Sequence, residues 1–326
     1  MKSAIITFVK LCITGLFFIY IFGKVDFHQF VNTMRGAHIG YIAGALVLLW
    51  GAHFLCVLRW RILMRQLMPT PSLARLVGIY FIGMFFNLTF PTIIGGDVVK
   101  VYYAGKTSRS YAESFASIFL DRDIGMLAMM IIACCAVLYH PVSVPGIPVA
   151  LILWCVFILF ILGNLAIFTP RFHRVANTAL QKPRLTKIAA KIAGITKAFR
   201  IMGKNPAALW ASLGISFANQ FLGCTVAWII ALNLDIHIPL FYFLIFVPVA
   251  TLISMIPVSL NGMGLREYSF MSLFGSIGVA DESCIALGLL YSLMIILSSL
   301  PGGLVYIFFR GKADGVNMAA IETGLE

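Results

Sequence analysis

Long apolar stretches without a charged residue recur along the whole of this 326-residue chain. A helix needs about 20 apolar residues to cross the roughly 30 Å hydrocarbon core of a bilayer. The stretches cover 36–58, 76–96, 124–170, 205–234, 236–265 and 283–309, with shorter runs at 11–23 and 268–280. No stretch is polar and long enough for a separate soluble domain. We therefore expect an all-α fold, a polytopic membrane helix bundle in a single integral membrane domain.

The scarcity of charge supports the same class. Charged residues make up 11% of the chain, less than half of the quarter that is usual in soluble domains. The 24 Lys and Arg exceed the 12 Asp and Glu by 12, and in so apolar a chain we expect this excess in cytoplasmic loops beside anionic headgroups. The seven cysteines lie in or beside apolar runs without CxxC spacing. We accordingly expect no nucleic-acid partner, no metal and no cofactor.

Two stretches need interpretation before spans can be assigned. Residues 1–23 have a basic start and an apolar run without a small-residue cleavage site, which predicts an uncleaved first helix. The 124–170 stretch is about twice the length of one span and carries prolines and a glycine at 140–146. It should therefore fold as two spans joined by a short turn.

Basic residues predict the orientation of the chain. They gather in 59–75, in 170–206 and at the start of the tail after 309, and the positive-inside rule places all three on the cytoplasmic side of the inner membrane, together with both termini. Loops on one side must be separated by an even number of crossings, yet three apolar segments lie between successive basic loops. One segment in each triplet should therefore enter the membrane and return.

The odd segment of each triplet is the one interrupted by proline and glycine. The interruptions are Pro91, Gly95 and Gly96 in the first half and Pro257, Asn261, Gly262 and Gly264 in the second. The order Pro, Gly, base, Tyr occurs at the same spacing in both: Pro91, Gly96, Lys100, Tyr102 and Pro257, Gly262, Arg266, Tyr268. This internal repeat divides the chain into a first half (1–169), a basic cytoplasmic loop (170–206), a second half (207–312) and a short tail (313–326).

The expected fold follows from these breaks. We predict about six spanning helices plus two re-entrant, broken helical hairpins in inverted repeats, an architecture typical of transporters. Irregular backbone at membrane depth is tolerated only against protein or a watery cavity, so the breaks also predict a polar cavity. Two alternatives stay open: the prolines kink ordinary spans, or 99–112 and 262–279 form an additional pair of crossings.

Several charged residues adjoin apolar windows and are the candidate substrate-binding residues. A charge at the bilayer centre costs about 2.5–3.5 kcal/mol on insertion scales, so such groups usually pair or line water. The candidates are Asp97, Lys100, Asp121, Arg122, Arg266 and Glu267. For Asp121 and Arg122 the alternative is a helix start at the interface, where the helix dipole stabilises acidic side chains. For Arg266 and Glu267 the alternative is a local ion pair that fixes the hairpin.

One segment of the long basic loop has helical amphipathicity. Ile188, Ile192, Ile195 and Phe199 recur at helical spacing, with lysines and arginines between them. This pattern predicts a helix on the cytoplasmic leaflet, which acts either as a topology anchor or as a platform that recruits anionic lipid.

Five stretches together resemble the lysylphosphatidylglycerol synthase transmembrane, or flippase-like, family. They are Leu58 to Leu63, Pro91 to Lys100, Ala116 to Gly125, Ile256 to Glu267 and Leu300 to Gly303. The resemblance covers about 1–312 and implies a multi-helix bundle whose best-known relatives move aminoacylated phosphatidylglycerol between leaflets. Without the soluble aminoacyl-transferase domain of those relatives, this chain resembles a stand-alone translocase module. Other relatives are tied to hopanoid or polyprenyl-phosphate sugar pathways, so the substrate stays open.

Three functions are compatible with these features. The leading one is an inner-membrane lipid translocase, in which Lys100, Arg122 and Arg266 would serve the phosphate of an anionic phospholipid or lipid-linked substrate, and Asp97, Asp121 and Glu267 the rest of the headgroup. The alternatives are an integral-membrane transferase with a lipid-linked donor, using Asp97 or Asp121 as base or metal ligand, and a non-catalytic partner of a separate lipid-modifying enzyme. A translocase is not an enzyme in the strict sense and needs no catalytic residue.

Overall fold

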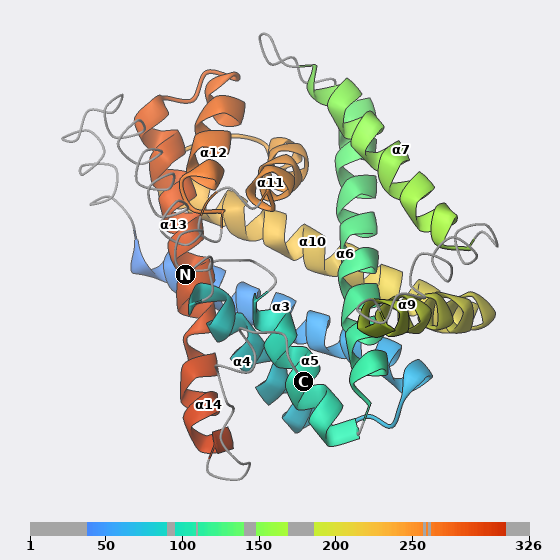
Figure 1. Cartoon of the computed structure of the whole chain (residues 1–326). Coiled ribbons are helices and arrows are strands. Elements are labelled where there is room, and N and C mark those ends of the chain that lie inside the picture. The colour runs from blue at the N-terminus through green and yellow to red at the C-terminus, as the bar shows by residue number, and fades with distance from the viewer. Residues whose placement is uncertain are drawn as a thin grey trace, which may run out of the picture.

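The computed structural model describes residues 38–89, 95–108, 110–139, 148–168, 186–256, 259 and 262–310, and the regular structure in these ranges is helical (Figure 1). Among the described residues, five segments are long and apolar enough to cross a membrane. They are α3 (Ile39–Leu67), α6 (Tyr111–Tyr139), α7 (Val149–Phe168), α10 (Pro206–Asn233) and the combined α13 (Asp281–Ser299) and α14 (Pro301–Arg310). The chain is therefore a polytopic helical membrane bundle. The predicted first span, 1–23, lies outside the described residues.

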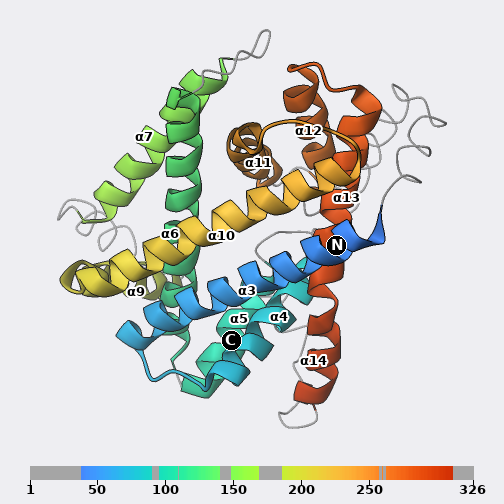
Figure 2. The same ribbon diagram turned by 180° about the vertical axis from the view of Figure 1, so that it is seen from behind.

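Helices α3 and α10 pack side by side on one face of the bundle and run antiparallel (Figure 2). The backbone N–H of His38 donates to Asn233 Oδ1 at 2.6 Å, which ties the start of α3 to the end of α10. At the other end, Asn205 Nδ2 donates to Gln66 Oε1 at 2.8 Å. Because each half contributes one of these helices, the two halves share one core.

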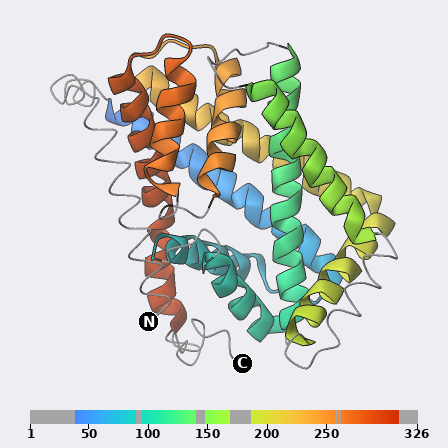
Figure 3. The ribbon, with the colours of Figure 1, turned by 45° about the horizontal axis from the view of Figure 1, so that its top comes forward.

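Two short helical hairpins flank this pair. One consists of α4 (Leu73–Thr89) and α5 (Gly95–Ser108), the other of α11 (Leu240–Ser254) and α12 (Leu265–Gly275). Their arms have 17, 14, 15 and 11 residues, which at 1.5 Å per residue gives about 16–26 Å, less than the bilayer core. The hairpins occupy opposite ends of the bundle (Figure 3). The order long helix, hairpin, long helix thus occurs in both halves.

The break glycines lie where each hairpin folds back on its first arm. The N–H of Gly96 donates to Asn87 Oδ1 at 2.7 Å, and a Cβ on Gly96 would lie 1.8 Å from a carbonyl oxygen of α4. Gly262 and Gly264 have φ of 75° and 79°, which favours glycine. Gly95, the first residue of α5, is buried. Pro91, Pro257 and Asn261 lie outside the described residues.

The structure bears on three interpretations of the sequence. Helix α3 continues to Leu67, so Arg59 belongs to a helix and not to a cytoplasmic loop over 59–75. Asp121 lies ten residues after the first residue of α6, about 15 Å along the axis, so it does not cap a helix start. The predicted amphipathic helix is present as α9 (Thr186–Lys204), and its described apolar residues, including Phe199, pack on α6.

Candidate functional site

Four of the six predicted substrate-binding residues line one cavity between α3, α4, α5 and α6. This polar cavity has a volume of about 250 Å³. It is lined by Arg59, Trp60, Tyr80, Met84, Asn87, Asp97, Lys100, Ile118, Asp121 and Arg122. The break after α4 carries Asp97 and Lys100 into the bundle on the first turns of α5. The sequence prediction that the first break borders a polar space agrees with this arrangement.

Asp97 is the centre of a group of three charges. Its carboxylate accepts from Arg122 Nε and forms an ion pair with Lys100 Nζ at 3.4 Å. Lys100 Nζ also lies 4.3 Å from the centre of the Tyr80 ring, a cation–π contact. Asp97 and Lys100 are buried. Because two cations face one carboxylate, the group carries one net positive charge, which suits an anionic ligand.

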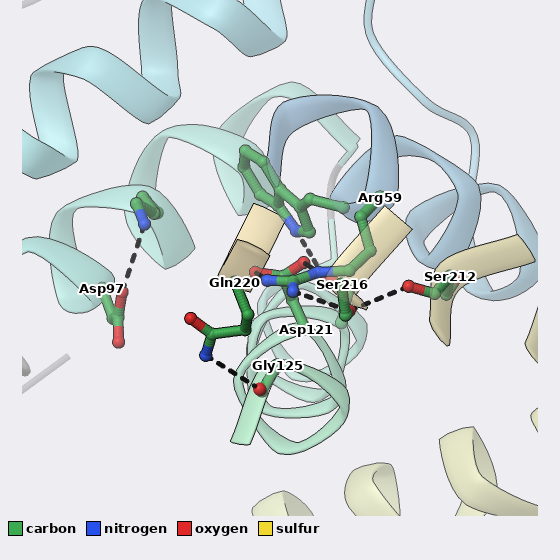
Figure 4. A network of polar contacts seen from close by, with 10 residues as sticks. Arg59, Asp97, Asp121, Gly125, Ser212, Ser216 and Gln220 are labelled. Atoms are coloured by element: carbon green, nitrogen blue, oxygen red, sulfur yellow. Dashed lines mark hydrogen bonds and ion pairs between the residues drawn. The ribbon is translucent and has the colours of Figure 1, made fainter. Parts of the chain in front are cut away.

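The second charged group in the polar cavity joins three long helices. Arg59 on α3 binds both carboxylate oxygens of Asp121 on α6, from Nε at 2.7 Å and from Nη2 at 3.0 Å. Its Nη1 donates to Ser216 Oγ on α10 at 2.9 Å. Figure 4 shows Arg59 and Asp121 pointing toward one another, with Ser216 and Ser212 on the adjoining helix. Both oxygens of Asp121 therefore already have partners within the protein.

Sequence reasoning missed Arg59 as a site residue because it was counted among loop bases. A signal was present in the helical spacing. The buried residues of α3 include Cys56 and Leu63, and Arg59 lies three residues after the first and four before the second, on the same face. A base that continues an apolar stripe must face the core and needs a partner there.

Arg266 lines a second cavity, which we call the inter-hairpin cavity because both hairpins contribute to it. Its volume is about 260 Å³. Its lining comprises Met84, Asn87, Leu88, Arg122, Thr251, Ser254, Met255, Arg266, Ile295 and Ser299. It shares Met84, Asn87 and Arg122 with the polar cavity. Each repeat thus contributes its basic residue to one of two adjoining cavities. Lys100 lines the polar cavity, and Arg266 lines the inter-hairpin cavity.

Glu267 is not among the lining residues of either cavity. Its Oε2 accepts from the N–H of Gly264 at 2.6 Å, and its Oε1 accepts from Ser292 Oγ at 2.5 Å. Ser292 in turn accepts from Arg266 Nη1 at 3.0 Å. Only 1% of Glu267 is exposed. Glu267 therefore caps the N-terminus of α12 (Leu265–Gly275) and positions Arg266 through Ser292.

An apolar cavity adjoins the two polar ones. It has a volume of about 400 Å³ between α5, α6 and α7, with Met255 at the end of α11. Its lining is mostly aliphatic and aromatic: Val98, Val101, Phe115, Ile118, Phe119, Met126, Phe160 and Met255, with Asp97, Arg122 and Asp123. Arg122 lines all three cavities. A charged side chain therefore lies where space for a polar group meets space for a hydrocarbon chain.

Comparison with known proteins agrees with this architecture. The chain is 22% identical over 299 residues to the UPF0104 membrane protein PH1989 of Pyrococcus horikoshii, an alignment that covers 85% of this chain and 89% of that protein. The family described as the lysylphosphatidylglycerol synthase TM region matches residues 7–303, a range that includes both hairpins and every candidate residue. The chain belongs to the lysylphosphatidylglycerol synthase TM region family.

Proposed function

We propose that this protein is a lipid translocase that moves a phospholipid or lipid-linked headgroup between the leaflets of the inner membrane. The observation that carries the proposal is the position of Arg122 at the junction of two polar cavities and one apolar cavity. A phospholipid has the matching division, a charged headgroup joined to hydrocarbon chains. Its headgroup would occupy the polar cavities while a chain lies in the apolar cavity or in the surrounding lipid.

The two hairpins support a transport path through the bundle. Their arms are too short to cross the hydrocarbon core, so we propose that each hairpin is re-entrant and brings its break to the interior. By the positive-inside rule, the basic loops favour a cytoplasmic location for both termini. With this orientation the hairpins enter from opposite faces, and the inter-hairpin cavity lies where they meet.

The charges indicate how a headgroup would be held. A phosphate beside Arg122 and Lys100 would join a group in which Asp97 already neutralises one of the two cations. Because the group carries one net positive charge, the phosphate would balance that charge and Asp97 would keep a cationic partner. The phosphate would share its cations with Asp97, which keeps binding weak enough for release of the lipid in the second leaflet.

Purified protein in vesicles tests the proposal. Vesicles of phosphatidylglycerol and phosphatidylcholine receive a trace of phosphatidylglycerol with a fluorescent acyl chain, and dithionite then bleaches the label in the outer leaflet. We expect the wild-type protein to make nearly all of the label accessible and Arg122→Gln to return the signal to that of protein-free vesicles. Arg75→Gln is the matched control, because Arg75 is exposed and lines none of the three cavities.

Two outcomes would contradict the proposal. Folded wild-type protein that leaves the inner-leaflet label protected is not a translocase of this lipid. A new lipid species in mass spectra of the vesicle extract, formed without movement of the label, would favour the transferase alternative. If neither movement nor product occurs, the role of a partner for a separate lipid-modifying enzyme gains support.

A further inference from the structure

We propose that Asp123 is a proton-binding site and that its protonated carboxyl holds α7 against α6 beside the apolar cavity. Release of the proton would free α7 and open this cavity to the surrounding lipid. Coupling of lipid movement to the proton rests on the proposed translocase function. Asp123 lines the apolar cavity and neither of the two polar cavities.

Asp123 lies well inside the long helix α6. It follows the first residue of that helix by 12 positions and precedes the last by 16, about 18 Å and 24 Å along the axis. The cavity around it is lined mostly by apolar side chains. An ionised carboxylate in such surroundings is unfavourable unless a cation or several donors compensate it. Carboxyl groups at membrane depth are for this reason frequent members of proton pathways.

The charged groups around Asp123 have other partners. Among the described residues no base forms an ion pair with Asp123. On the same helix Asp121 binds Arg59, and Arg122 binds Asp97 of α5, which also lines the apolar cavity. Helices α7, α10 and α11 contain no Asp, Glu, Lys or Arg. The bases of α9 whose side chains are described are exposed: Lys197, Arg200 and Lys204.

The neighbour of Asp123 on α7 is Asn164, and its hydrogen bonds favour a protonated acid. The Asp123 carboxyl lies within hydrogen-bonding reach of the Asn164 side chain. Asn164 Nδ2 donates to the Phe160 carbonyl at 3.1 Å, whereas Oδ1 is buried and has no donor among the described residues. A carboxylic acid has one O–H donor, and an amide nitrogen has two N–H donors. Protonated Asp123 can therefore donate to Oδ1 and accept the second N–H, while ionised Asp123 leaves Oδ1 without a donor.

Helix α7 is loosely attached, so one polar contact can decide its position. Figure 1 shows it at the outside of the bundle beside α6. Only 11% of the residues in its spanning window are buried, against 44% for α6. Asn164 is the one amide side chain in its sequence, and Phe160 on the turn before it lines the apolar cavity. A proton that strengthens the contact of Asp123 with Asn164 therefore closes this side of the cavity.

A proton taken up from water on one side and released to water on the other would drive lipid movement. The apolar cavity adjoins the polar cavity, and Asp97 lines both, which gives water a route toward Asp123. With one proton moved for each lipid, a difference of one pH unit sustains at most about a tenfold unequal distribution of lipid between the leaflets.

Vesicles with a pH difference test this coupling. Full-length protein is reconstituted with a trace of phosphatidylglycerol that carries a short fluorescent chain, and valinomycin with equal potassium on both sides clamps the membrane potential. Extraction of the label into albumin measures its distribution between leaflets, with protein-free vesicles as background. We expect a several-fold unequal distribution with the wild type, none with Asp123→Asn, and the wild-type value with Asp235→Asn. Asp235 is the matched control, because its side chain is 97% exposed.

Two further measurements need no lipid movement. Infrared difference spectra between acidic and neutral pH should contain a protonated-carboxyl band that Asp123→Asn loses and Asp235→Asn keeps. Spin labels at the exposed positions Leu165 on α7 and Trp210 on α10 should lie further apart at high pH. Asp123→Asn, whose amide can donate to Asn164 Oδ1, should keep the short distance at every pH. Asn164→Leu should keep the infrared band and lose the change in distance.

The outcomes separate this inference from the proposed function. An unchanged infrared band in Asp123→Asn would show that Asp123 binds no proton and would overturn the inference. Lipid movement that ignores the pH difference would support a translocase and reject proton coupling, and a sodium difference that replaces the pH difference would reject the proton as the ligand. If no lipid moves, the translocase function fails. The infrared band and the label distance then decide the proton site by themselves: it stands if both change with pH and falls if neither does.

Discussion

Removal of the Asp121 carboxylate should be among the most destabilising single changes in this protein. In the folded chain Arg59 makes two hydrogen bonds to Asp121 and one to Ser216, and the side chains of the pair are 6% and 12% exposed. Asp121→Ala leaves Arg59 buried with one neutral partner. Breaking a buried pair from one side costs about 3–5 kcal/mol. We expect the free energy of unfolding to fall by about that amount.

Reversible unfolding in mixed detergent micelles, followed by circular dichroism, measures this loss. Ser216→Ala is the matched control, because it removes one hydrogen bond of Arg59 and leaves the ion pair, at an expected cost of about 1–3 kcal/mol. The double variant Arg59→Met with Asp121→Leu removes both charges. It should recover most of the loss, since apolar replacement of a whole buried pair is often neutral or stabilising.

The comparison among these three variants decides whether the reasoning is right. If Asp121→Ala costs no more than Ser216→Ala, the pair does not compensate the burial of Arg59. If the double variant is as unstable as Asp121→Ala alone, the loss comes from packing around α6 and not from an unpaired guanidinium. Either result would refute the interpretation that Asp121 is needed to compensate the burial of the Arg59 charge.

Three further predictions follow from the hairpins and the charge cluster. Gly96→Ala should lower the free energy of unfolding by about 1–3 kcal/mol, because the new Cβ would lie 1.8 Å from a carbonyl oxygen of α4. Gly214→Ala is the control, since the space around Gly214 is open, and thermal unfolding compares the two variants. Lys100→Met should leave the protein at least as stable but slow lipid movement in vesicles, and unchanged movement would contradict a role for this cation. A cysteine pair at Leu88 and Met255, which both line the inter-hairpin cavity, should be joined by a short bifunctional reagent in a background without native cysteines, and failure of the pair to join would place the hairpins apart.

Much of the fold could be predicted from the sequence because membrane spans depend on local properties. Length and apolarity are enough to locate five of the spans, and the 124–170 stretch is divided between α6, which ends at Tyr139, and α7, which begins at Val149, as expected. Helix ends were harder to predict. Arg59 looks like the start of a loop, because a charge usually ends a span; only its partner on α6, 62 residues further along the chain, makes burial possible.

The candidate site shows the same limit more clearly. The sequence places Asp97, Lys100 and Arg122 beside apolar windows, and the structure brings them to one cavity. The sequence does not reveal that Glu267 binds the start of its own helix or that Asn87 binds the backbone of Gly96. Such contacts depend on how a chain folds back after a break. Spacing along the sequence gives no measure of that geometry.

The distribution of charge in the bundle separates structural groups from groups available for binding. Asp121 and Glu267 have both oxygens occupied by protein donors, so they compensate buried groups of the fold. Lys100 differs, since Asp97 already has Arg122 as a partner and one cation is enough to neutralise it. A second buried cation costs about 2.5–3.5 kcal/mol on insertion scales and adds no pairing that the fold requires. Its presence beside a cavity supports the proposal that an anionic headgroup binds there.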